Sequence, residues 1–511
     1  AIAFTPRDTT DMRGPQLVAF IALDASQGDY SKQSGAAIHN AKVKLESIMP
    51  HHMASPILIA MPHLPVSEGI VDRMRLHKMA AVLYAQEVQT TRVEGLGTVH
   101  ASGFVEQSFA QSRLWLLDQV YPGLEWYISP AALRIRGSLD LDTFKTALSV
   151  LQHRHEILRT TFESSGGLHV QRVHSPAPIN LEIRRLDITN GDVLPLILRR
   201  EMKTTIDLEA DFGWKASVYQ LADGDCIFTL SMHRIVADAA STNTLLRDLA
   251  SIYSAIARGE KPAMNADSAA LQYSHASVWE KQQIQLDSQQ QQMGYWINKL
   301  STSQPAEFLT DRLRPAVLSG DSGQMAFNID QARYHKLQRF SADRKVTPTA
   351  VLLAILRATH FRHTNVKNAT FGLINEGRYG DEFQDVLGPF ETIQCITTES
   401  EEESFESLVQ QVQTTLKEAS THKEVPFERI VAEMHKDRDA SRHPLVQVVL
   451  RLHDESATDV KMVDLETERL ALQKSSPFDL EFNLVIQDQG LECTVVFSQD
   501  LYDMTTIEHI V

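Results

Sequence analysis

The amino-acid sequence predicts an α/β protein, built as a small amino-terminal α/β unit followed by two larger lobes of similar size. From residue 105 to the end, short apolar runs typical of buried strands alternate with helical patterns. A Gln-rich stretch, residues 280–300, divides this region into two halves. Residues 89–104, with Thr, Glu, Gly and Ser and little periodicity, predict a linker before the lobes.

Residues 1–88 carry the pattern of one small α/β unit. Residues 16–23 and 57–61 are typical of buried strands, and residues 36–49 of an amphipathic helix. The following Pro- and Gly-punctuated segment resembles the end of adenylation domains of nonribosomal peptide synthetases, in which a Lys orients the acyl adenylate. Ile70 stands at that position, and the large ATP-binding part is absent. We interpret residues 1–88 as a remnant of an adenylation-domain C-terminal subdomain that cannot adenylate a substrate by itself.

The linker, residues 89–104, contains no Gly-Gly-Asp-Ser-type segment, so we expect no carrier protein between the amino-terminal unit and the lobes. We expect the first lobe to span residues 105–285 and the second to span residues 286–511. The Gln-rich residues 280–300 predict a solvated connector helix between the two lobes.

Composition excludes several classes of protein. The 511 residues have a formal net charge of -16 and no Lys/Arg-rich run, so the basic face that nucleic acid requires is not expected. No apolar run approaches the roughly 20 residues that span a bilayer, and no signal peptide is visible. The three cysteines, Cys226, Cys395 and Cys493, are too few and too far apart for a disulfide framework. We therefore expect a reduced, cytoplasmic protein, and a chain without an initial Met that ends within a helical pattern indicates a piece of something larger.

Seven segments of the lobe region form an ordered set. They are residues 108–115, 154–162, 233–239, 273–279, 387–395, 422–428 and 438–445. The set resembles the core motifs of condensation domains of nonribosomal peptide synthetases, such as Ser-x-Ala-Gln-x-Arg-Leu-Trp in the first segment and His-His-x-x-x-Asp-Gly in the third. One such match is weak evidence, whereas seven in the family's order are specific.

The resemblance implies a fold and a reaction. The fold is α/β, with two chloramphenicol acetyltransferase-like lobes packed in a V. In the family, carrier proteins bring two thioesters to the third motif on phosphopantetheine arms, and the acceptor amine attacks the donor carbonyl. Tethering supplies much of the rate of such a reaction. The implied partners are therefore carrier protein domains and neighbouring synthetase domains, with no cofactor bound directly.

The third motif departs from the family at its reactive position. His233 matches the first His, which mainly packs and orients the loop in the family. Arg234 replaces the second His, which is credited with orienting or deprotonating the amine. Because a guanidinium stays protonated in proteins, Arg234 cannot act as a general base. It could instead clamp an anion or form a buried ion pair with Asp238 or Glu391.

The remaining candidates surround this motif. The family assigns Asp238 a structural salt bridge, for which Arg378 is the expected partner, and Arg113 of the first motif is also expected to be structural. Ala239 replaces a Gly, so its methyl group would narrow the channel and disfavour a positive φ. Ser241 is expected to cap the helix that follows. The substrate channel is expected to be lined by Ala239, Ser241, Glu391 and Gln394. We expect no metal, because the spacing of His360 and His363 lacks a completing carboxylate or Cys.

Three functions remain open. A condensation domain with a degenerate motif could serve as a scaffold or docking domain, as in the recruiting domains of some peptide synthetases, which bind tailoring oxygenases. Those domains share Arg234 and Asp238 but have a second acid where this chain has Ala239. Alternatively, acyl or peptidyl transfer between carrier-bound thioesters could survive through His233. A free-standing acyltransferase is least favoured, because it needs a His at position 234. We expect peptide-bond formation to be impaired or absent.

Overall fold

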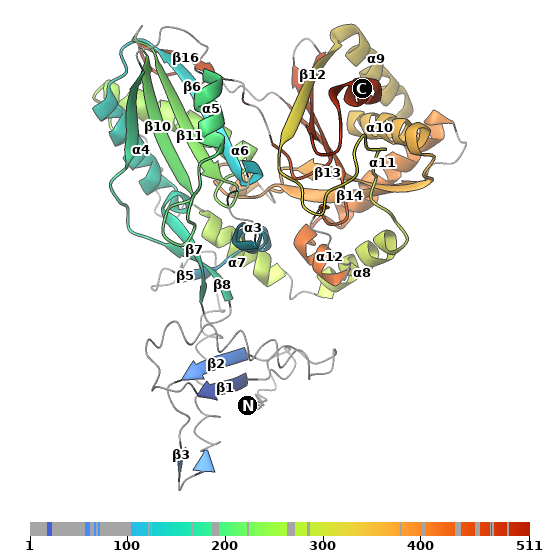
Figure 1. The fold of residues 1–511 in the computed structure, drawn as a ribbon, viewed down its shortest axis with the longest axis horizontal. Coiled ribbons are helices and arrows are strands. Elements are labelled where there is room, and N and C mark those ends of the chain that lie inside the picture. Colours follow the sequence, from blue (N-terminus) through green and yellow to red (C-terminus); the bar gives the residue numbers. More distant parts are fainter. Residues whose placement is uncertain are drawn as a thin grey trace. The chain divides into compact units, whose positions relative to one another are not determined.

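The computed structural model describes a defined part of the chain (Figure 1). It describes four short strands within residues 18–71, and residues 104–511 except for 121–122, 124, 166–167, 187–193, 222–223, 263–270, 284–286, 379–380, 400–403, 435–440, 455–459, 471, 473–474 and 488–489. The chain divides into two compact units. The first holds residues 1–106 and 162–172, and the second holds residues 107–161 and 173–511.

The first unit contains two parallel strands, β1 (Val18–Ala22) and β2 (Ile57–Met61), with Val18 opposite Ile57. The two strands predicted at residues 16–23 and 57–61 are therefore confirmed. The predicted helix at residues 36–49 and most of the linker lie outside the described residues. Five further strands form two small sheets. β3 (Val66–Ser67) pairs with β4 (Ile70–Val71), and β8 (Leu168–Val173) lies between β5 (Phe104–Glu106) and β7 (Thr160–Ser165).

The second unit contains two lobes, each built on its own sheet (Figure 1). The first lobe is called the N-lobe and the second the C-lobe. The sheet of the N-lobe has the order β16-β6-β11-β10-β9. Its strands are β6 (Ile128–Arg136), β9 (Leu181–Leu186), β10 (Trp214–Leu221), β11 (Cys226–His233) and β16 (Glu466–Arg469). All eight residues of β11 are buried, as expected for a central strand with helices on both faces.

The alternation of β11 fixes which helices cover which face of the N-lobe sheet. Phe228 packs on Phe144 of α4 (Leu141–Arg154), with ring centroids 4.9 Å apart. Ser231, on the opposite face, donates a hydrogen bond of 3.0 Å to Glu201 of α5 (Leu194–Met202). α6 (Ala239–Ala257) begins shortly after β11 and packs beside α4. His233 ends β11 on the same face as Ser231.

The sheet of the C-lobe has the order β12-β18-β17-β15-β13-β14. Its strands are β12 (Ser322–Asp330), β13 (Asn368–Asn375), β14 (Thr392–Glu399), β15 (Val448–Asp454), β17 (Leu480–Gln487) and β18 (Gly490–Ser498). Its helices are α9 (Gln331–Arg344), α10 (Pro348–Thr364), α11 (Phe405–Thr421), α12 (Phe427–Glu433) and α13 (Met504–Ile510). Buried Val, Leu, Ile and Phe side chains from these elements form one continuous core.

Elements between and across the lobes shape the site. In the chain, α3 (Phe109–Val120) comes before β6 and α7 (Tyr273–Gln283) comes after α6. Short 3-10 helices lie at Glu125–Tyr127, Glu156–Arg159 and Asp381–Phe383. β16 comes from the second half of the chain, yet it pairs antiparallel with β6 of the N-lobe, with Glu466 opposite Arg136. One strand of the second half therefore completes the sheet of the first.

The predicted solvated character of the connector helix at residues 280–300 is wrong. Residues up to Gln283 belong to α7, and α8 (Asp287–Ser301) begins after the undescribed residues 284–286. Trp296 and Leu300 of α8 are buried in the C-lobe core, and the Trp296 indole N–H donates 2.9 Å to the carbonyl of His422. The apolar face of α8 packs against the C-lobe core. The Gln run, residues 289–292, precedes Trp296 and Leu300 in the helix.

Candidate functional site

The loop between β11 and α6 carries His233, Arg234 and Asp238, and backbone hydrogen bonds fix it. The N–H of His233 donates to the carbonyl of Gly213 (2.8 Å), and the N–H of Arg234 donates to the carbonyl of Tyr127 (2.7 Å). Ile235, Val236 and Ala237 follow these two anchored residues and are buried. The loop is therefore held from both neighbouring strands, and its polar side chains have defined positions.

His233 is only 1% exposed, and its proton can be placed on one nitrogen. The backbone N–H of Ile235 donates to its Nδ1 at 3.1 Å. Because Nδ1 accepts a hydrogen bond, a neutral imidazole must carry its proton on Nε2. Nε2 faces Asp118 Oδ1 of α3 at 3.7 Å and has no hydrogen-bond partner among the described residues. The contact at Nδ1 and the burial of the ring fit the predicted packing and orienting role of His233.

Arg234 makes neither of the ion pairs that the sequence left open. Among the described residues its guanidinium forms no salt bridge, and its Nε is buried without a hydrogen-bond partner. Asp238 and Glu391 are each paired with a different arginine. Arg234 still acts on Glu391 through space, because its positive charge helps to lower the pKa of that carboxyl.

Asp238 is paired with Arg378, the partner expected from the sequence. The two guanidinium nitrogens of Arg378 each lie 3.1 Å from one Asp238 oxygen, and both side chains are at most 3% exposed. Asp238 also accepts from the backbone N–H of Phe390 at 3.1 Å. Gly377 makes this approach possible, since its φ is +63° and an added Cβ would lie 1.8 Å from the Phe390 carbonyl oxygen. The pair joins the N-lobe motif to the C-lobe segment before β14.

The predicted capping role of Ser241 is wrong. The N-cap of α6 is Asp238, with an extended backbone (φ -92°, ψ -175°), and it accepts from the Ser241 N–H at 2.7 Å. Ser241 already lies in the first turn of the helix. Its hydroxyl donates to the Gly388 carbonyl (2.9 Å) and accepts from the Gly388 N–H (3.0 Å) and from Arg378 (3.0 Å). Ser241 therefore fastens residues near Gly388 to the motif.

The backbone penalty predicted for Ala239 does not arise. Ala239 is the first residue of α6, and it is not among the described residues with positive φ. Helical backbone accommodates Ala without strain, so the replacement of a Gly costs no conformational energy here. Ala239 is exposed, and its N–H points to Glu391 Oε1 at 3.4 Å.

Glu391 is held by Arg451, a residue that the sequence analysis did not select. Arg451 Nη2 lies 3.1 Å from Glu391 Oε2, and Nη1 contacts Oε1 as well, while Arg451 Nε lies 3.7 Å from Glu481. Burial alone would raise the pKa of Glu391, but the charge and hydrogen bonds of Arg451 outweigh it and lower the pKa to about 2. Arg451 is the one Arg within the mostly apolar strand β15, and a charged residue at such a position indicates a buried ion pair.

The other predicted residues lie around this centre. Gln394 accepts 3.2 Å from the side chain of Asn375 on the neighbouring strand β13. Arg113 of α3 forms a salt bridge of 3.0 Å with Glu428 of α12. These two contacts stabilise the framework.

Asp118 is the second site residue that the sequence did not predict, after Arg451. It lies two helical turns after the buried Gln111, and this spacing is the signal that places it on the buried face of α3.

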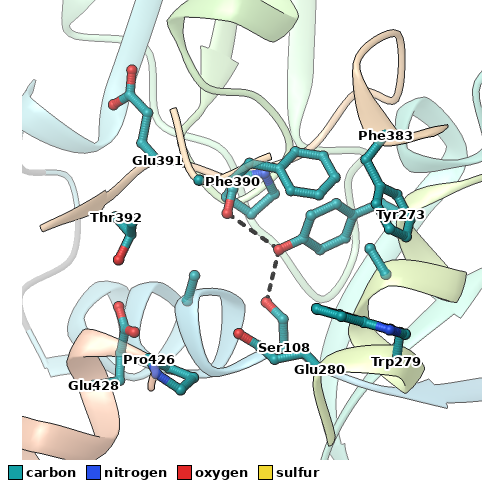
Figure 2. Close-up of a pocket in the computed structure, with 14 residues that line it drawn as sticks. Ser108, Tyr273, Trp279, Glu280, Phe383, Phe390, Glu391, Thr392, Pro426 and Glu428 are labelled. Atoms are coloured by element: carbon teal, nitrogen blue, oxygen red, sulfur yellow. Dashed lines mark hydrogen bonds between the residues drawn. The ribbon is translucent and has the colours of Figure 1, made fainter. Parts of the chain in front are cut away.

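A small cavity of about 50 Å³ borders Glu391 (Figure 2). Tyr273 lines this cavity, and Figure 2 shows the hydrogen bonds of its hydroxyl. The hydroxyl lies 2.9 Å from Ser108 Oγ and 3.2 Å from the Pro389 carbonyl oxygen. Burial raises the pKa of Tyr273 well above its ordinary value, so this phenol stays protonated. A Cβ on Gly388 would lie 1.9 Å from the Tyr273 ring. Of the four predicted channel residues, Glu391 alone lines this cavity.

Two further properties hold for the described part of the chain. No helix there has the length and apolar character to cross a membrane. Within the same residues, no cluster of three or more His, Cys, Asp or Glu side chains is arranged to hold a metal ion. His360 is buried in α10 and lies 3.1 Å from the Glu307 carbonyl, and burial lowers its pKa to about 4. It therefore has a structural role.

Comparisons with known proteins give three kinds of match. The family model described as the condensation domain matches residues 101–511. The chain is 41% identical over 419 residues to the nonribosomal peptide synthetase dtxS1 of Metarhizium robertsii and 38% identical over 412 residues to the cyclosporin synthetase simA of Tolypocladium inflatum. The match to dtxS1 covers 82% of this chain and 5% of that synthetase, and the match to simA covers 80% of this chain and 3% of that synthetase.

Solved structures match over a similar part of the chain. The X-domain from teicoplanin biosynthesis gives a TM-score of 0.75 at 28% identity, covering 81% of this chain and 94% of that structure. The condensation domain of the monacolin K polyketide synthase MokA gives a TM-score of 0.69 at 16% identity, covering 81% and 96%. The second match concerns the fold alone.

Proposed function

The chain belongs to the condensation-domain family of nonribosomal peptide synthetases, and from this premise we propose that it no longer forms peptide bonds but serves as a scaffold or docking domain. The observation that carries the proposal is the geometry of His233 and Arg234. The backbone N–H of Ile235 donates to His233 Nδ1, so a neutral imidazole there would carry its proton on Nε2. The neighbouring position holds a guanidinium, which cannot take up a proton.

Glu391 is a carboxylate beside Arg234 that could be considered as a replacement for the missing base. Its pKa of about 2 makes it a weak proton acceptor at neutral pH, because a good general base has a pKa near the working pH. Both of its oxygens are engaged by Arg451. These facts argue against Glu391 as the base and support the loss of proton transfer at this motif.

A docking role is supported by one of the structural neighbours. A second solved structure of the teicoplanin X-domain, 27% identical to this chain with a TM-score of 0.75, is a complex with OxyB. We infer by analogy that this chain binds a partner enzyme, in addition to carrier protein domains with phosphopantetheine arms and neighbouring synthetase domains. We also propose that residues 1–88 are an adenylation-domain remnant, residues 89–104 a linker, and residues 105–285 and 286–511 the two lobes.

A condensation assay tests the proposal directly. Donor and acceptor carrier proteins, loaded with a panel of aminoacyl thioesters, are mixed with the chain, and the acceptor carrier is analysed by mass spectrometry. We expect no joined product above the level without the domain. Product that forms with the unchanged chain and disappears with His233→Ala would show that His233 still supports acyl or peptidyl transfer. A family member with both motif histidines serves as the positive control.

A further inference from the structure

We propose that Glu391 is an internal ligand, whose carboxylate occupies the oxygen-binding position at the start of α6 and keeps acyl groups out of the motif. This inference rests on the proposed function of a domain without condensation activity. It adds a second cause for that loss, independent of the missing base.

The placement of Glu391 is fixed by the residues just before it. Gly388 exchanges two hydrogen bonds with the Ser241 hydroxyl, and the Phe390 N–H donates to Asp238. Residues 388–390 are thus docked along the first turn of α6. Glu391 is the next residue, and this docking brings its Oε1 to 3.4 Å from the Ala239 N–H.

The start of α6 is a place where oxygen ligands are stabilised. The first N–H groups of a helix have no acceptor within the helix and carry partial positive charge. Asp238 accepts a hydrogen bond from the N–H of Ser241, and Glu391 accepts one from the N–H of Ala239. An acyl carbonyl or carboxylate that approached this turn would have to displace the Glu391 carboxylate.

Two arginines make that displacement costly. Arg451 binds both oxygens of Glu391, and this charge-assisted contact is stronger than a neutral hydrogen bond. Arg234 adds a positive charge that also favours the ionised carboxylate. Arg234 has no salt bridge to another acid among the described residues, so Glu391 is the anion that balances it. Removal of this carboxylate would leave a cavity with positive charge on several sides.

A Glu391→Ala variant tests the proposal by chemical rescue. We expect its thermal unfolding midpoint to fall by about 3–6 °C in sodium chloride, because the two arginines lose their anion. Sodium acetate at equal ionic strength is expected to restore at least half of the loss, since acetate can occupy the vacated position. The unchanged chain and Asp385→Ala should respond equally to the two salts. Asp385 is the matched control, because its ion pair with Arg247 is exposed.

An equal effect of acetate and chloride on Glu391→Ala would overturn the proposal. If the variant is recovered unfolded, the yield of refolded monomer in acetate is compared with that in chloride, and equal yields overturn it too. Glu391→Gln should show no acetate response, because the amide fills the same space. Joined product from the unchanged chain in the carrier assay would instead refute the proposed function, so the two failures are distinguishable.

Discussion

Replacing Arg234 with His and Glu391 with Val together is expected to raise condensation about 10²–10⁴-fold over the unchanged chain, the range that a positioned general base contributes. Arg234→His supplies an imidazole at the position of the missing proton acceptor. Glu391→Val removes the carboxylate from the start of α6 and places an apolar side chain there. The measurement is the initial rate of joined product on loaded carrier proteins.

The single variants separate the two causes. In Arg234→His alone, the ionised Glu391 beside the new imidazole would raise the pKa of that imidazole and keep it protonated. Its rate should therefore be lower than that of the double variant near neutral pH and increase as the pH rises. Glu391→Val alone should remain inactive. Equal rates for Arg234→His and the double variant would show that the base alone is limiting.

Removing Arg378 is expected to destabilise the second unit by about 3–5 kcal/mol, the usual cost of leaving one charge of a buried pair unpaired. Arg378→Ala would leave the Asp238 side chain, which is 3% exposed, without its counter-charge. Urea unfolding followed by tryptophan fluorescence measures the effect. Arg247→Ala is the matched control, because the Arg247–Asp385 pair is exposed and its loss should cost less than about 1 kcal/mol.

A double-mutant cycle sharpens this second prediction. Arg378→Ala/Asp238→Ala should be less destabilised than the sum of the two single variants, because it buries no unpaired charge. Asp238→Ala alone also removes the cap of α6 and the acceptor for Phe390, so its cost should be similar to that of Arg378→Ala. Strictly additive effects would mean that the two side chains do not stabilise each other.

The fold could be predicted because its signals are local and repeated. Alternating apolar runs predicted the α/β organisation, and the seven ordered segments predicted two chloramphenicol acetyltransferase-like lobes, a fold that the match to solved condensation domains confirms. The same reasoning predicted the Asp238–Arg378 pair, which the structure shows at 3.1 Å. The error at α8 arose because its Gln run hid the apolar spacing of Trp296 and Leu300.

Contacts between distant segments could not be predicted from local patterns. Arg451 of β15 contacts Glu391, and Asp118 of α3 lies 3.7 Å from His233. No residue near His233 in the sequence predicts either contact. Ser241 was misassigned because the helix begins one turn earlier than expected, so Asp238 is the cap. The engagement of His233 Nδ1 by a backbone N–H depends on the exact turn, which sequence does not resolve.

The strand β16 has a consequence for how the protein is made. During synthesis, β6, β9, β10 and β11 leave the ribosome long before residues 466–469. Until those four residues emerge, the backbone of β6 keeps an open edge that can pair with a strand of another chain. The first lobe therefore cannot complete its sheet until residues 466–469 have been synthesised, and expressing it alone would leave that edge open to aggregation.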